Sequence, residues 1–85
     1  MAITVTLRYF AAIREAIGHG SEPCSTVAHD VATLRDSLIA RGAPYAEALA
    51  RGKSVRIAVD QRMGDETTAL HDGAEVAFFP PVTGG

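Results

Sequence analysis

The residue whose chemistry stands out is the last one, Gly85, because its terminal carboxylate is the only charge after Glu75. Gly84 and Gly85 carry no side chain, so their backbone can pass through a space too narrow for other residues. Pro80 and Pro81 restrict φ to about −65° and favour an extended conformation for the residue before each of them. We expect a thin, uncharged strip with a carboxylate at its tip, suited to insertion into the narrow active site of another protein.

The alternative is an inert terminus, because domain ends are often slack and Gly-Gly alone is weak evidence of function. A slack end is usually polar, whereas this one follows two phenylalanines and two prolines that make a stiff, apolar base. This base favours a functional tail. The residues expected to contact a partner are Phe79, Pro80, Pro81, Val82 and Thr83.

A carboxylate is a poor electrophile, but adenylation would convert that of Gly85 into a mixed anhydride with a good leaving group. A sulfur nucleophile could then displace AMP and leave a thiocarboxylate, –C(=O)S⁻, which is ionised near neutral pH. The chain has neither Gly-x-x-x-x-Gly-Lys nor Gly-x-Gly-x-x-Gly, the usual loops for binding ATP or a dinucleotide. We therefore expect no bound cofactor, with ATP used in trans by an activating enzyme.

No other set of residues predicts a catalytic or metal site. The histidines lack metal-ligand spacing, and the single cysteine has no assignable base nearby. The favoured interpretation of Cys24 is a half-buried cysteine in a strand. The acids at 65–66, Asp72 and Glu75 are expected to be solvated. The three histidines are His19, His29 and His71.

The length and composition describe one small domain. Its 85 residues leave no room for a second core, and 47% hydrophobic residues are enough for the first. A net charge of −2 and scattered arginines argue against a nucleic-acid-binding protein, which normally carries a basic stripe. There is no visible secretory signal, no apolar run of about 18 residues and only one cysteine. We expect a cytoplasmic protein that binds neither nucleic acid nor membrane.

The first half of the chain is predicted to contain two strands and two helices. Residues 3–8 alternate apolar and polar side chains, which predicts a strand with its odd-numbered residues buried. Residues 10–17 change to a helical period with Phe10 on the buried face. Residues 22–28, which include Pro23, are expected to form a strand antiparallel to the first.

The main helix follows at residues 30–41. Asp30 is a good N-cap, and an apolar stripe repeats at helical spacing, with Arg35 expected on the outer side. Pro44 suits a first helical turn and begins a short segment that ends at residue 51. The remaining expectations are a strand at 55–59, a turn at 61–65 and an irregular segment at 66–70.

The last strand, residues 74–79, is predicted to position the tail. Glu75 should face water, so alternation places Phe79 outward and sends Val76 and Phe78 into the core. The order of elements indicates an α+β fold, a mixed sheet with the main helix packed across one face and the final strand well paired. Residues 1–79 would form this domain and residues 80–85 a flexible Gly-Gly tail.

The last residues, from Glu75 to Gly85 (EVAFFPPVTGG), resemble the end of the small, sulfur-carrier subunit of molybdopterin synthase. Residues 7–11 (LRYFA) and the turn at 72–73 are also similar, so the resemblance covers the whole chain. It implies a ubiquitin-like β-grasp fold and a cytosolic protein that is not an enzyme on its own.

The resemblance also implies a reaction and its partners. Gly85 would be adenylated by an activating enzyme, thiocarboxylated and inserted into the large subunit, within a heterotetramer. It would there supply sulfur for the dithiolene built on cyclic pyranopterin monophosphate, in molybdenum cofactor synthesis. Gly84 would keep the tail thin, and Phe79 matches a partner-facing position of the family.

Two alternatives stay open. Sister carriers that serve thiazole, cysteine or tRNA thiolation also end in Gly-Gly, although Phe-Phe-Pro-Pro before it favours the molybdopterin role. A ubiquitin-like binding module whose tail does no chemistry would have the same fold.

Overall fold

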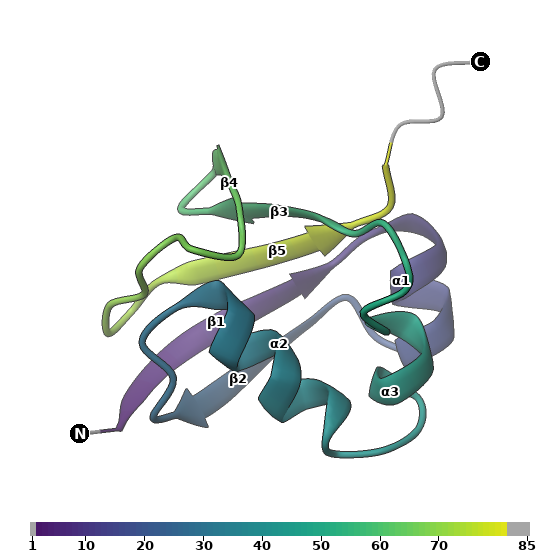
Figure 1. Cartoon of the computed structure of the whole chain (residues 1–85), viewed down its shortest axis with the longest axis horizontal. Helices are drawn as coiled ribbons and strands as arrows, with labels where there is room; N and C mark the ends of the chain where they lie inside the picture. Colours follow the sequence, from purple (N-terminus) through teal and green to yellow (C-terminus); the bar gives the residue numbers. More distant parts are fainter. Residues whose placement is uncertain (1, 82–85) are drawn as a thin grey trace.

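The computed structural model describes residues 2–81, and these form a five-stranded sheet with helices packed against it (Figure 1). The elements are β1 (Ile3–Tyr9), α1 (Ala11–Ile17), β2 (Ser21–Thr26), α2 (Val31–Ile39), α3 (Tyr45–Ala48), β3 (Arg56–Val59), β4 (Arg62–Gly64) and β5 (Glu75–Phe79). The strand order is β2-β1-β5-β3-β4, with β1 and β5 parallel and the other neighbours antiparallel. The predicted α+β fold with a mixed sheet is confirmed.

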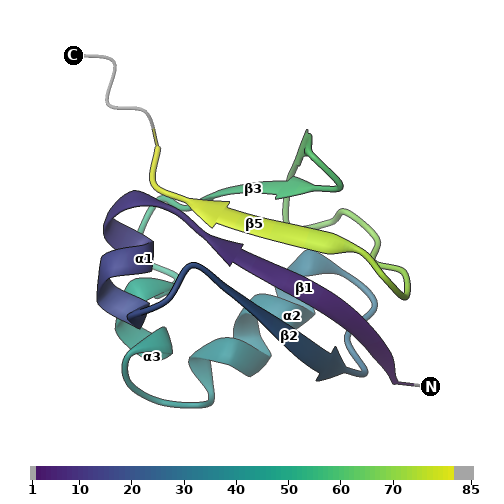
Figure 2. The same cartoon turned by 180° about the vertical axis from the view of Figure 1, so that it is seen from behind.

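The described helices leave one face of the sheet open. α2 and α3 lie across the other face, and α1 lies beside the end of β1 (Figure 2). None of the helices in residues 2–81 has the length and apolarity needed to cross a bilayer. The largest fully buried side chains are Tyr9, Phe78, Leu7, Leu34, Leu38, Leu49, Val5, Val31 and Val76.

The two central strands follow the predicted alternation. Val5 and Leu7 of β1 are fully buried, and so are Val76 and Phe78 of β5. β5 lies between β1 and β3, which confirms that the final strand is well paired. A strand that is bonded along both edges gives the tail a rigid base.

Pro23 fits into β2 because its nitrogen faces the free edge of the sheet. Tyr9 donates its N–H to the carbonyl of Gly20 at 3.0 Å, and hydrogen-bonded pairs alternate along an antiparallel ladder. Thr6 and Pro23 are opposite each other in a pair between two bonded ones. The missing N–H of proline therefore removes no bond to β1, and the predicted antiparallel pairing forms.

The main helix, α2, begins where predicted, but one of its side chains does not lie where expected. Asp30 accepts the N–H of Thr33 at 2.8 Å as the N-cap. Arg35 was expected on the outer side, yet it is only 4% exposed. Its Nε donates to the carbonyl of Leu49 at 2.8 Å and its guanidinium donates to that of Ala50 at 2.7 Å. The buried guanidinium therefore joins α2 to the end of α3.

The segment at 61–65, expected to be a turn only, contains the short strand β4. The turn before it consists of Asp60 and Gln61, which have positive φ values of 52° and 68°. Two such residues form the tight connection that suits a β-hairpin. Neither is a glycine, so the usual sequence signal of this hairpin is absent.

Candidate functional site

The tail leaves the sheet from the end of β5. Phe79 pairs with Arg56 of β3, and the half-buried Pro80 and Pro81 follow it. The other predicted site residues lie outside the described part of the chain: Val82, Thr83, Gly84 and Gly85. The chemistry at Gly85 and the division into a domain and a tail at residue 80 therefore stay predictions.

Phe79 lies on the open face of the sheet, as the alternation predicts, and it contacts a second phenylalanine. The ring of Phe10 meets that of Phe79 edge-on, with centroids 6.3 Å apart and an angle of 87°. Phe10 was predicted on the buried face of a helix, but it is 41% exposed. The reason is that α1 begins at Ala11, and Phe10 is its extended N-cap with φ −129° and ψ 153°. The helical period therefore does not include Phe10.

A cation lies beside this aromatic pair. The guanidinium of Arg8 is 5.6 Å from the ring centroid of Phe10, within the range of a cation–π contact. The same guanidinium is 3.4 Å from a carboxylate oxygen of Glu75. Arg8 thus links the start of β5 to the aromatic pair across the open face.

Small apolar residues continue the surface from Phe79 across the open face. Ala58 of β3 is opposite both Ala77 of β5 and Met63 of β4. Both alanines are 8% exposed, whereas Met63 is 58% exposed. The apolar groups that this face exposes are therefore Met63, Phe10 and the half-buried Phe79, and such groups favour a contact with another protein. We call this surface the open-face strip; it consists of Phe10, Ala58, Met63, Ala77 and Phe79.

Among these strip residues, only Phe79 is predicted from the sequence to contact a partner. Met63 was assigned to a turn, because β4 is too short for an alternating pattern to be visible. The register with Ala58 places its side chain on the same face as Ala77. The sequence gives only a weak indication that Met63 is a contact residue, because it is an apolar residue within the polar segment 60–66.

The end of the sheet near the tail is braced by a polar cluster. Tyr9 stacks on Phe78, with ring centroids 6.2 Å apart, and its hydroxyl donates to Oε2 of Glu22 at 2.9 Å. The hydroxyl of Tyr45 donates to the same oxygen at 2.7 Å, and Nε2 of His19 lies 2.8 Å from it. Burial alone would raise the pKa of Glu22, but these three hydrogen bonds outweigh it and hold that pKa below its ordinary value. An ionised Glu22 therefore connects four segments: β1, the turn at His19, β2 and α3.

The remaining candidate groups in residues 2–81 are the possible metal ligands and Cys24. No group of three His, Cys, Asp or Glu side chains in this range could hold a metal ion. Cys24, predicted to be half-buried, is 4% exposed in β2, and its Sγ lies 3.4 Å from the guanidinium of Arg41. The reactive group predicted from the sequence, the carboxyl group of Gly85, lies outside this range.

Comparison with known proteins agrees with this arrangement. Residues 7–85 match the ThiS family. The chain belongs to the ThiS family. The match extends through Gly85, so it includes the predicted reactive end.

Individual proteins also resemble the chain over nearly its whole length. The molybdopterin synthase sulfur carrier subunit of Escherichia coli (strain K12) is 38% identical over 81 residues, covering 95% of this chain and 99% of that protein. Putative molybdopterin converting factor, subunit 1, from Pyrococcus furiosus has a TM-score of 0.76 at 26% identity, covering 94% of this chain and 99% of that one. These matches confirm the ubiquitin-like β-grasp fold.

One solved structure contains such a protein with a partner. It is the complex of subunits 1 and 2 of molybdopterin-converting factor from Helicobacter pylori 26695. The matching chain has a TM-score of 0.63 at 28% identity, covering 98% of this chain and 100% of that one.

Proposed function

We propose that this chain is the sulfur-carrier subunit of molybdopterin synthase and that the terminal carboxyl group of Gly85 carries the sulfur. The observation that carries the proposal is the family match through Gly85, together with 38% identity to a relative with this role. The Phe-Phe-Pro-Pro segment before Gly-Gly favours this role over that of the sister carriers.

The proposed chemistry takes place on the tail and within other proteins. In an activating enzyme, a carboxylate oxygen of Gly85 attacks the α-phosphorus of ATP and releases pyrophosphate. A nucleophile that supplies sulfur at the oxidation level of sulfide then attacks the carbonyl carbon, AMP leaves, and loss of the remaining S–H proton gives the thiocarboxylate. In the large subunit, the thiocarboxylate sulfur bonds to a carbon of cyclic pyranopterin monophosphate, and water then cleaves the thioester to Gly85 and restores its carboxylate. Each carrier supplies one sulfur, so the dithiolene requires two of them.

The folded domain contributes position rather than catalysis. β5 holds the start of the tail between β1 and β3, and the polar cluster around Glu22 stiffens that end of the sheet. The open-face strip supplies an apolar surface next to the tail, on which the large subunit binds. Since large subunits of this type dimerise in the family that the chain resembles, the expected complex is a cytoplasmic heterotetramer.

The decisive experiment is sulfur transfer in a defined mixture. The thiocarboxylated chain, its large subunit and cyclic pyranopterin monophosphate should yield the dithiolene product, and a variant lacking Gly85 should yield none while keeping the wild-type melting temperature. If the thiocarboxylated chain gives no product, the molybdopterin role is wrong. If the variant without Gly85 supports product formation, the tail does no chemistry.

A further inference from the structure

The outer edge of β3 is covered over only part of its length. β4 pairs with residues 57–59 of β3, and the pairing ends where Gly64 lies opposite Ile57. After Gly64 the chain leaves the sheet and passes close to α2 (Figure 1). The part of the β3 edge nearest the tail is therefore open.

The departure of the chain has a cause in the hydrogen bonding of α2. The carbonyl of Glu66 accepts the N–H of Ala32 at 2.9 Å, and that of Thr68 accepts the N–H of Val31 at 3.1 Å. These N–H groups lie in the first helical turn and have no partner within the helix. Because residues 66–68 satisfy them, they cannot also continue β4 along β3.

Val55 directly precedes β3, and the alternation of this strand places its N–H and C=O toward the open edge. Asp60 donates its N–H to the carbonyl of Glu75 at 2.9 Å, so even-numbered residues of β3 bond toward β5 and odd-numbered ones toward β4. Val55 is the next odd-numbered residue, and no residue in the range 2–81 bonds to its N–H or carbonyl. A free N–H and C=O on a strand edge are the groups that an added strand uses.

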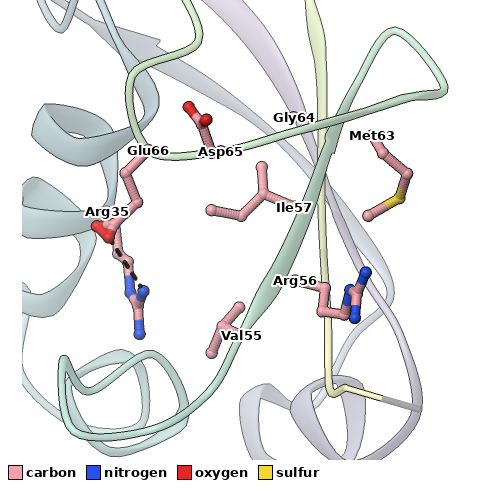
Figure 3. A pocket seen from close by; sticks show the side chains of 8 residues that line it. All are labelled: Arg35, Val55, Arg56, Ile57, Met63, Gly64, Asp65 and Glu66. Carbon is pink, nitrogen blue, oxygen red and sulfur yellow. Dashed lines mark ion pairs between the residues drawn. The ribbon is translucent and has the colours of Figure 1, made fainter.

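A groove of about 500 Å³ runs along the open edge (Figure 3). Val55 and Ile57 supply its apolar part, and Met63 lies on the side of the open face. The ion pair between Arg35 and Glu66, with 3.6 Å between the charged atoms, closes the side toward α2. The groove can therefore accept an extended backbone with one side chain packed on Ile57.

We propose that an extended segment of the molybdopterin synthase large subunit adds to this edge as a short strand, bonded to the N–H and C=O of Val55. The proposal rests on the proposed function. Met63 belongs to both the groove and the open-face strip, so a partner that covers the strip also reaches the groove. Arg56 lines the groove without an ion-pair partner in the described residues, so we expect an Asp or Glu on the added segment.

The opposite edge of the sheet, along β2, does not offer an equal site. The outward position of Pro23 lacks an N–H, so a strand added there would lose a bond in its centre. Ser25 is the next residue of β2 with an N–H on the outer side. It provides a matched control for Val55.

Amide hydrogen exchange tests the added strand directly. The Val55 amide should exchange quickly in the free chain and at least about tenfold more slowly in the complex with the large subunit, while Ser25 should not change. A complex that forms without protecting Val55 would overturn the added strand and leave the proposed function intact. Failure to form any complex would overturn both. Protection of Val55 by self-association, or by the activating enzyme alone, would overturn the choice of the large subunit.

A proline scan gives a second measurement. Val55→Pro removes the donor and should weaken binding of the large subunit about fivefold, whereas Ser25→Pro should change it by less than about twofold. Melting temperatures of both variants establish that they are folded. Equal affinities of the two folded variants would contradict the proposal, and if Val55→Pro does not fold, the exchange measurement decides alone.

Discussion

Phe78 and Phe79 are neighbours on β5 and have the same side chain, but they lie on opposite faces of the sheet. Phe78 is fully buried and stacks on Tyr9, whereas Phe79 is half-buried and contacts Phe10, which is itself 41% exposed. The chain's own helices cover one face, and none of its described elements covers the other. The same residue type therefore stabilises the fold on the helix-covered face and is available for binding on the open face.

The two faces also differ in the size of their side chains. The covered face is filled with large aliphatic and aromatic residues, whereas the centre of the open face has Ala58 and Ala77. The side chains that remain accessible on this face are Met63, on the β4 side of the alanines, and the half-buried Phe79 on β5. A partner can therefore use Met63 and Phe79 as two apolar anchors.

The largest effect is expected from Phe78→Ala. The substitution leaves a cavity in the core against Tyr9, so it should lower the free energy of unfolding by roughly 3–5 kcal/mol. Urea denaturation measures this change. A loss below about 1 kcal/mol would show that the helix-covered face does not depend on Phe78 and would break the comparison.

The next effect is expected from Phe79→Ala. A partner that buries this ring gains about 1.5–3 kcal/mol, so binding of the large subunit should weaken by roughly tenfold to a hundredfold. Titration calorimetry measures the affinity, and the melting temperature should change little. Equal losses of affinity and stability would mean that Phe79 supports the fold as much as Phe78 does.

The faces of β5 could be predicted from the sequence because one charge decided them. Glu75 had to face water, and strict alternation then placed Phe78 inward and Phe79 outward. The strand β1 and the apolar stripe of α2 were predicted by the same local periodicity. These patterns depend only on neighbouring residues and on a single buried face.

The errors arose where contacts between distant segments decided the structure. Arg35 is buried because the carbonyls of Leu49 and Ala50, fourteen and fifteen residues away, accept its protons. The start of α1 excludes Phe10 from the helical stripe, and the end of β4 is set by the capping of α2. The open-face strip therefore could not be assembled from local patterns, although Phe79 could.

Met63, on the β4 side of the open-face strip, allows a second test of binding by this face. Because 58% of it is exposed, Met63→Ala should weaken binding of the large subunit by about 1 kcal/mol and leave stability nearly unchanged. Val27→Ala is the matched control, since Val27 is 77% exposed but lies outside the strip. If the two substitutions weaken binding equally, exposure rather than position on the open face explains the effect.

The smallest effect is expected at the far end of β5, from an exposed pair that should influence stability alone. Nε2 of His71 lies 2.7 Å from Oδ2 of Asp60, whose Oδ1 accepts the N–H of Glu75 at 3.0 Å. The bond to Asp60, and then that to the carbonyl of Asp72, raises the pKa of His71 above its ordinary 6.5. The protonated imidazole therefore stabilises the fold fully below pH 6.5, and this stabilisation is lost as the pH rises through the raised pKa.

Melting temperatures measured from pH 6.5 upward isolate the contribution of the pair of His71 and Asp60 to stability. The wild type should lose stability as the pH rises from 6.5, and His71→Gln should lose less because it has no proton to release. Val27→Ala is the control, since Val27 is exposed and has no ionisable group, and it should keep the wild-type slope. Affinity for the large subunit should be the same in all three proteins at each pH, because the pair is not part of the open-face strip. If His71→Gln keeps the wild-type slope, the pair of His71 and Asp60 does not stabilise this end of β5. If His71→Gln changes the affinity for the large subunit, the open face depends on this pair.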